Sequence, residues 1–120
     1  MRPIRLAAVF PEHLNLNGDV ANREVIAAYL GWQGFTVELV DLDRASEAEK
    51  SEPDFVVIGH GSIAAWNQIS PAFKEFKTVI ETWLSSQVLI LAISTGRDAL
   101  MNAHAGTAGH LPAIGIVDST

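Results

Sequence analysis

Hydrophobic residues along the chain are concentrated in short runs, separated by longer segments of mixed polarity. Residues 4–10, 55–58 and 88–93 are almost continuously apolar, which is typical of strands buried on both faces of a parallel sheet. Residues 35–40 alternate between apolar and polar positions and predict a further strand that ends at Asp41. A short run at 113–117 predicts a last strand.

The segments between these runs predict helices. Asp19 is a candidate N-cap for a helix over residues 20–33, and Gly34 is a natural stop. A second helix is expected over residues 71–84, a helical turn around 45–50, and a short helix over 97–103. The apolar positions with helical spacing are Val25, Ile26, Tyr29, Leu30 and Trp32 in the first helix, and Phe73, Phe76, Ile80 and Trp83 in the second.

Strands that alternate with helices predict a parallel, doubly wound α/β sheet. A length of 120 residues fits a single domain with one core. In such a sheet, functional groups gather where the strands end. The segments that follow three predicted strands, residues 11–19, 59–62 and 94–96, are therefore expected at one edge.

Composition narrows the classes of function. The net charge of −6 and a pI near 5.0 disfavour binding to nucleic acid or an anionic membrane surface. The absence of cysteine excludes disulfides and cysteine-ligated metals, and the histidines lack metal-ligand spacing, so neither a metal nor a cofactor is expected. The apolar N-terminal stretch is too short for a signal peptide, and no run could span a membrane. The chain is therefore expected in the cytoplasm.

Ser94 follows the most hydrophobic predicted strand and precedes a predicted helix. A serine at such an elbow is a candidate nucleophile, because the N–H groups of the next helix favour an oxyanion there. The alternative is that Ser94 only caps that helix. The glycine loop, residues 59–62 (Gly-His-Gly-Ser), could aim N–H groups into a pocket or could simply end a strand, and His60 is either a proton carrier or a loop residue.

Together, residues 11–22 (PEHLNLNGDVAN), 54–62 (DFVVIGHGS), 91–96 (LAISTG) and 115–120 (GIVDST) resemble the CobB/CobQ-like class I glutamine amidotransferases. Within that family they are most similar to the amidotransferase subunits of lipid II isoglutaminyl synthases. The resemblance implies a flavodoxin-like three-layer sandwich, of which this chain would be the N-terminal half.

The resemblance also implies a chemistry. In the family, an elbow cysteine attacks the side-chain amide of glutamine, backbone N–H groups stabilise the oxyanion, and the released ammonia passes to a synthetase or ligase partner. Ser94 occupies the cysteine position, and Gly61 and Thr95 lie where oxyanion donors are expected. The remaining residues expected around the substrate are Gly59, Ser62, Gly96 and Arg97.

The chain departs from the family pattern at the elbow. It reads Ser94-Thr-Gly-Arg-Asp where the family has Cys-Gly-Gly-Tyr-Gln, and His60 replaces a usual glycine. It also ends before the half that carries the family's catalytic histidine. A serine hydroxyl needs a positioned base to become a nucleophile, and Thr95 adds a β-branched side chain beside it. These departures predict little or no glutaminase activity.

Several hypotheses for function follow. The first is an amidotransferase-like domain without glutaminase activity that binds a partner or regulates it. The alternatives are an active amidotransferase of cell-wall or cobalamin-type biosynthesis seen as a fragment or Cys-to-Ser form, a hydrolase that uses Ser94 with His60 as base, and a small-ligand binder or oligomerisation unit. A truncated sheet leaves an open edge, so a homo-oligomer is also expected.

Overall fold

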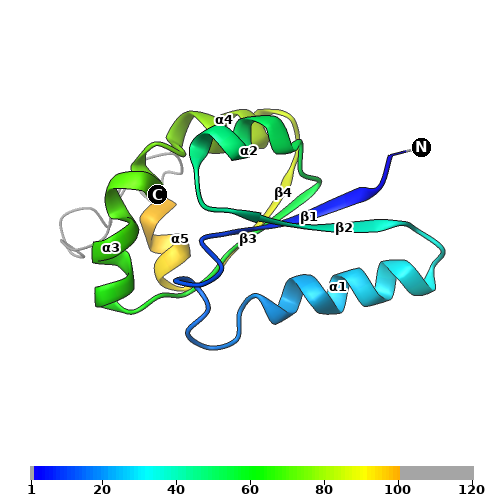
Figure 1. The fold of residues 1–120 in the computed structure, drawn as a ribbon, viewed down its shortest axis with the longest axis horizontal. Coiled ribbons are helices and arrows are strands. Elements are labelled where there is room, and N and C mark those ends of the chain that lie inside the picture. The colour runs from blue at the N-terminus through cyan, green and yellow to red at the C-terminus, as the bar shows by residue number, and fades with distance from the viewer. Residues whose placement is uncertain (1, 101–120) are drawn as a thin grey trace.

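Four parallel strands form the centre of the computed structural model, which describes residues 2–100 (Figure 1). Their order in the sheet is β2-β1-β3-β4. The strands are β1 (Ile4–Val9), β2 (Val37–Leu42), β3 (Phe55–Ile58) and β4 (Leu89–Ala92). The predicted parallel α/β sheet is confirmed, and its arrangement is consistent with a flavodoxin-like three-layer sandwich. The strand predicted at 113–117 lies outside the described residues.

Helices cover both faces of the sheet. Helix α1 (Ala21–Trp32) lies on one face, while α2 (Ala45–Ser51) and α4 (Lys77–Ser85) lie on the other (Figure 1). Helices α3 (Ile63–Lys74) and α5 (Thr95–Leu100) lie toward the end of the sheet where the strands finish. None of the helices within residues 2–100 is long and apolar enough to cross a membrane.

The main core lies between the sheet and the α2, α3 and α4 side. Its centre is aromatic: the Phe76 ring lies 5.4 Å from Phe10 and 6.3 Å from Phe73, centroid to centroid, and Phe73 meets Trp66 edge-on at 5.2 Å. All four side chains are buried. Alternate residues of β1 and β3 complete this core, as expected from the period of two along a strand.

The helix predicted over residues 71–84 is wrong at its start. The chain instead forms two helices, and the first of them begins eight residues earlier, at Ile63. The Ser62 hydroxyl accepts a hydrogen bond from the Ala65 N–H at 3.1 Å and caps α3. Pro71, expected at a first helical position, lies inside α3. Burial of Trp66, Ile69 and Phe73 outweighs the hydrogen bond that the proline removes.

Three smaller boundary predictions also change. Strand β2 begins two residues later than predicted, at Val37, and α5 begins at Thr95 rather than Arg97. Helix α1 begins at Ala21, and Asp19 does not cap it. The predicted stop at Gly34 is confirmed, since Gly34 has a φ of +92° that side chains disfavour.

The apolar spacing of α1 does not mark one buried stripe. Ile26 and Leu30 are half-buried against the sheet side, whereas Val25, Tyr29 and Trp32 are exposed. The helical spacing of these five apolar positions therefore combines two sides of the helix, one toward the sheet and one toward solvent. Only Arg23 is fully buried in this helix; its Nη1 donates to the Asp41 carboxylate at 2.7 Å and to the Val40 carbonyl at 2.8 Å.

Phe76 is predicted to be a major source of stability, because it joins α3 to α4 in the aromatic centre. Phe76→Ala removes a fully buried ring and is expected to lower the free energy of unfolding by about 3–5 kcal/mol. Leu84→Ala in α4, where the side chain is exposed, is the control and should change it by less than ~1 kcal/mol. Urea unfolding followed by tryptophan fluorescence measures both, and equal effects would contradict the prediction.

Candidate functional site

The three segments singled out by the sequence meet at the carboxyl ends of the strands. The Leu16 N–H donates to the His60 carbonyl at 3.0 Å, and the His60 N–H donates to the Asp19 carboxylate at 2.9 Å. The Gly61 N–H donates to Thr95 Oγ1 at 3.0 Å. These bonds fasten the loop after β1 and the elbow after β4 to the glycine loop between them.

Ser94 has the backbone of a strained elbow. It is exposed, lies between β4 and α5, and has a φ of +52°, which is uncommon for a residue with a side chain. Its carbonyl accepts the Asp98 N–H at 2.9 Å and so starts α5. Within residues 2–100 no hydrogen bond involves the Ser94 hydroxyl, so the capping alternative is not observed.

Gly96 and Gly59 allow the elbow to pack closely on the glycine loop. A Cβ at Gly96 would lie 2.5 Å from the Ile58 carbonyl oxygen and 2.6 Å from that of Gly59. A Cβ at Gly59 would collide with the Leu14 carbonyl oxygen. The sequence around this elbow lacks the Gly-x-Ser-x-Gly pattern of hydrolase elbows, because Ala92 stands at the position of the first glycine.

The Thr95 hydroxyl is the centre of the site. It accepts hydrogen bonds from the Gly61 N–H and from Trp66 Nε1, the latter at 2.8 Å. A threonine oxygen has two lone pairs and one proton, so these two donors fill its acceptor capacity. Its proton is left for His60 Nδ1 at 3.0 Å or the Gly61 carbonyl at 3.3 Å. We call Thr95 with His60, Gly61 and Trp66 the Thr95 clasp.

His60 contacts Thr95 and not Ser94. Its Nδ1 lies 3.0 Å from Thr95 Oγ1 and also receives the Thr95 N–H at 3.4 Å. A ring nitrogen that faces two donors acts as an acceptor, so the neutral ring carries its proton on Nε2. No hydrogen bond joins His60 to Ser94 in the part of the chain that the structure describes.

Both N–H groups expected to stabilise an oxyanion are therefore occupied. The Gly61 N–H donates to the Thr95 hydroxyl, and the Thr95 N–H points at His60 Nδ1. The two side chains that accept these bonds are those of Thr95 and His60. Both stand at positions where the chain departs from the amidotransferase pattern.

The other predicted binding residues have different placements. Ser62 caps α3 through its hydroxyl. The Arg97 side chain is exposed and lies 3.9 Å from the Asp98 carboxylate. Two residues of the site were not predicted from the sequence: Asp19, whose buried carboxylate was expected only to cap the first helix, and Trp66. In the sequence, the Leu-Asn-Leu-x-x-Asp pattern of residues 14–19 could have indicated that Asp19 belongs to the site.

An acidic cluster lies beyond the end of β2. Partial desolvation raises the pKa of Asp43, which remains largely exposed, above its ordinary value of 3.8. The nearby carboxylates of Glu47, Asp41 and Glu12 raise it further, while His13 lowers it. Within residues 2–100 no three His, Asp or Glu side chains are placed to hold a metal ion.

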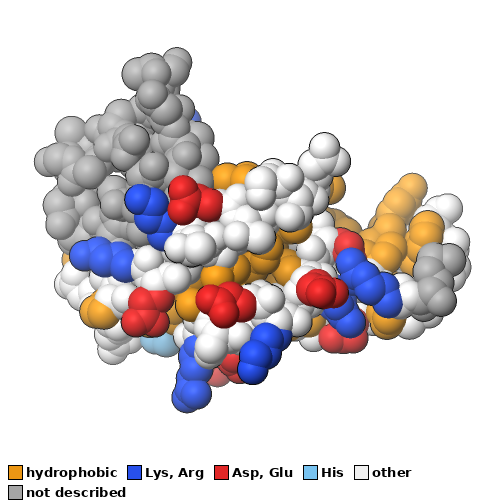
Figure 2. Space-filling model, turned by 90° about the horizontal axis from the view of Figure 1, so that it is seen from above, with side chains coloured by type: hydrophobic (Ala, Val, Ile, Leu, Met, Phe, Trp, Pro, Cys, Tyr) orange, Lys and Arg blue, Asp and Glu red, His pale blue; other side chains and the backbone are white. Residues whose placement is uncertain are grey.

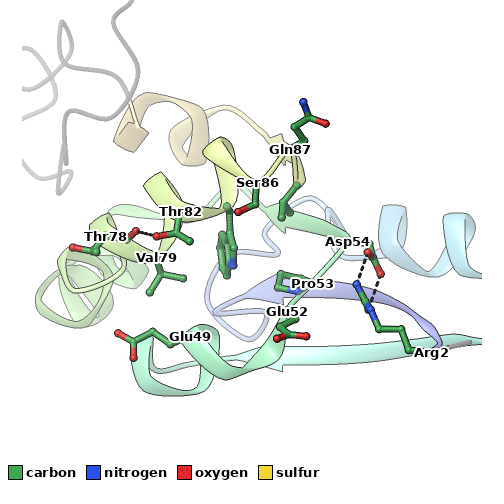
Figure 3. A pocket seen from close by; sticks show the side chains of 12 residues that line it. Arg2, Glu49, Glu52, Pro53, Asp54, Thr78, Val79, Thr82, Ser86 and Gln87 are labelled. Atoms are coloured by element: carbon green, nitrogen blue, oxygen red, sulfur yellow. Dashed lines mark hydrogen bonds and ion pairs between the residues drawn. The ribbon is translucent and has the colours of Figure 1, made fainter.

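Ser94 lines neither of two cavities found in the described part of the chain. A cavity of about 370 Å³ lies beside the site, between the loop after β1 and α3, and includes His13, Leu16 and Ser62. A larger one of about 580 Å³ lies at the opposite end of the sheet, between α2 and α4, over Val79 and Trp83 (Figure 3). Figure 2 looks onto this side and shows hydrophobic side chains between acidic ones. The larger cavity is thus separate from the elbow.

No model of a protein family matches the chain, and no curated protein sequence matches it.

Removing the Thr95 hydroxyl is predicted to destabilise the domain. Thr95→Val leaves the Gly61 N–H and Trp66 Nε1–H without their acceptor, which costs about 1–3 kcal/mol of unfolding free energy. Thr95→Ser keeps the hydroxyl and should lose less than ~1 kcal/mol. Urea unfolding measures the stabilities, and the indole N–H resonance of Trp66 should shift only in the valine variant. A valine variant as stable as the wild type would refute the clasp.

Asp43 is predicted to favour folding only when it is protonated. Because its folded pKa is raised above 3.8, its contribution is present below that pH and is lost as the pH rises through the folded pKa. Asp43→Asn should therefore raise the Tm at pH 7, by an amount corresponding to no more than ~0.5 kcal/mol since the side chain is exposed, and the gain should vanish near pH 3. Glu81→Gln, an exposed carboxylate on α4, is the control, and a gain that persists at pH 3 would contradict the assignment.

Proposed function

We propose that this chain is an amidotransferase-like binding domain that lacks glutaminase activity. The proposal rests on one observation: the N–H groups of Gly61 and Thr95 are both directed at side chains of the Thr95 clasp. The resemblance to the class I family implies that these N–H groups would otherwise stabilise the oxyanion.

Hydrolysis of glutamine at this elbow has two requirements. The Ser94 oxygen must lose its proton as it attacks the carboxamide carbon, and the oxygen of that amide must receive hydrogen bonds as it becomes negative. Loss of a single oxyanion donor slows acyl transfer by about 10²–10³-fold. Here a substrate would have to displace the Thr95 hydroxyl from Gly61 and His60 from the Thr95 N–H.

The position of His60 supports the same proposal. Its Nδ1 is engaged by Thr95, and within residues 2–100 no side chain forms a hydrogen bond to the Ser94 hydroxyl. A hydrolase that uses Ser94 with His60 as its base is therefore less favoured than a domain with a silent elbow. The Ser94 backbone has the strained φ of an elbow. The N–H groups of Gly61 and Thr95 and the His60 ring, which would make Ser94 reactive, instead form hydrogen bonds with one another's segments.

Exposed apolar side chains support a role in binding. On β4, Ile90 and Ala92 pack against the main core, so Leu89 and Leu91 face the side of the sheet on which α1 lies. Leu89 is 70% exposed and Leu91 37%. Large apolar residues gathered on a surface are typical of contact with another protein, and the family resemblance implies a synthetase or ligase as one such partner.

The chain is predicted to release no ammonia from glutamine above the buffer background. Ser94→Cys should remain equally inactive, because the occupied N–H groups are unchanged, although iodoacetamide should alkylate its exposed thiol. A coupled ammonia assay and mass spectrometry measure the two results, with a known glutaminase as positive control. Glutamine-dependent ammonia from the wild type, or an acyl adduct on Ser94, would overturn the proposal.

A further inference from the structure

The outer side of helix α1 carries an uninterrupted apolar stripe. Ala21, Val25, Ala28 and Trp32 are all exposed, and Trp32 is exposed to 82%. Their spacing of four, three and four residues places them in one row along the helix, as in the seam of packed helix pairs. These positions lie on the side of the helix opposite to the half-buried Ile26 and Leu30, and in Figure 1 no described element lies on the side of α1 away from the sheet.

The sheet does not account for this stripe. Helix α1 already turns Ile26 and Leu30 toward the sheet, and a surface helix of a monomer is ordinarily polar on its other side. The positive charge of Arg23 is buried and paired with Asp41. Glu24 is then the only exposed charge on α1, in a protein of net charge −6. This is a surface on which two copies could meet without strong repulsion.

The stripe is complementary to itself. If two α1 helices pack antiparallel about a two-fold axis between Ile26 and Ala27, Trp32 lies opposite Ala21 of the partner subunit. In the same register Val25 lies opposite Ala28 of the partner subunit. Each large side chain therefore meets a small one, as close helix packing requires.

The geometry points to a homodimer formed through the outer face of α1. The exposed parts of Val25, Tyr29, Trp32 and the adjacent Phe35 amount to about 500 Å² per copy on typical side-chain areas, or about 1,000 Å² in total. That is at the lower limit for a specific interface, so a dissociation constant in the micromolar range is expected. The inference does not depend on whether the elbow is catalytic.

Sedimentation equilibrium over 1–500 µM tests the interface. The wild type is expected to dimerise, and Ala28→Glu, which places a carboxylate in the centre of the stripe beside Glu24, should raise the dissociation constant at least tenfold. Ala64→Glu, an exposed alanine on α3, is the matched control and should dimerise as the wild type does. Circular dichroism verifies that the variants are folded. A wild type that stays monomeric, or an Ala28→Glu variant that dimerises unchanged, overturns the proposal.

Engineered cysteines test the register, since the chain has none of its own. A mixture of the single variants Val25→Cys and Ala28→Cys should form a disulfide-linked heterodimer on mild oxidation, because these positions face each other. A mixture of Ala21→Cys and Val25→Cys is the control and should cross-link at least tenfold more slowly. Equal cross-linking in both mixtures would contradict the antiparallel pairing.

Discussion

The hydroxyl of Thr95 is the contact on which the carboxyl edge of the sheet depends. One oxygen accepts from the glycine loop and from the indole of α3 and faces the ring of His60. Its bonds join segments that are 29 to 35 residues apart. Since Thr95 is also the first residue of α5, they hold the elbow after β4 against the end of β3. Buried polar groups must be paired in this way to be tolerated.

The pairing that stabilises this edge also occupies two of its backbone N–H groups. An oxyanion hole requires N–H groups that are fixed in place but have no partner until substrate arrives. At this elbow the strained φ of Ser94 and the tight packing of Gly96 are present, while the N–H groups of Gly61 and Thr95 already have partners. The backbone geometry of a reactive elbow and the availability of its donors are thus separate properties, and a few side chains decide the second.

The two faces of the sheet differ in how completely they are covered. The face beneath α2 and α4 packs against a continuous aromatic core. The opposite face is covered by α1 among the described elements, leaving Leu89 and Leu91 exposed, and α1 itself is apolar on both of its sides. The exposed apolar residues among the described elements are thus found mainly on the side away from the main core.

The sequence by itself determined the sheet. Short, nearly continuous apolar runs predicted the bounds of β1, β3 and β4 closely, because turn-forming and polar segments separate them in the sequence, although Leu89 and Leu91 of β4 are exposed. The glycine loop and elbow were placed correctly at the strand ends. Tertiary structure decided the rest. Helical spacing cannot say whether Trp32 faces the sheet or solvent, since both sides of α1 are apolar, and it cannot show that the burial of Trp66 and Phe73 extends α3 through Pro71. The hydrogen bonds between Thr95 and His60 join residues 35 apart, and no local pattern specifies a contact that only the folding of the chain brings about.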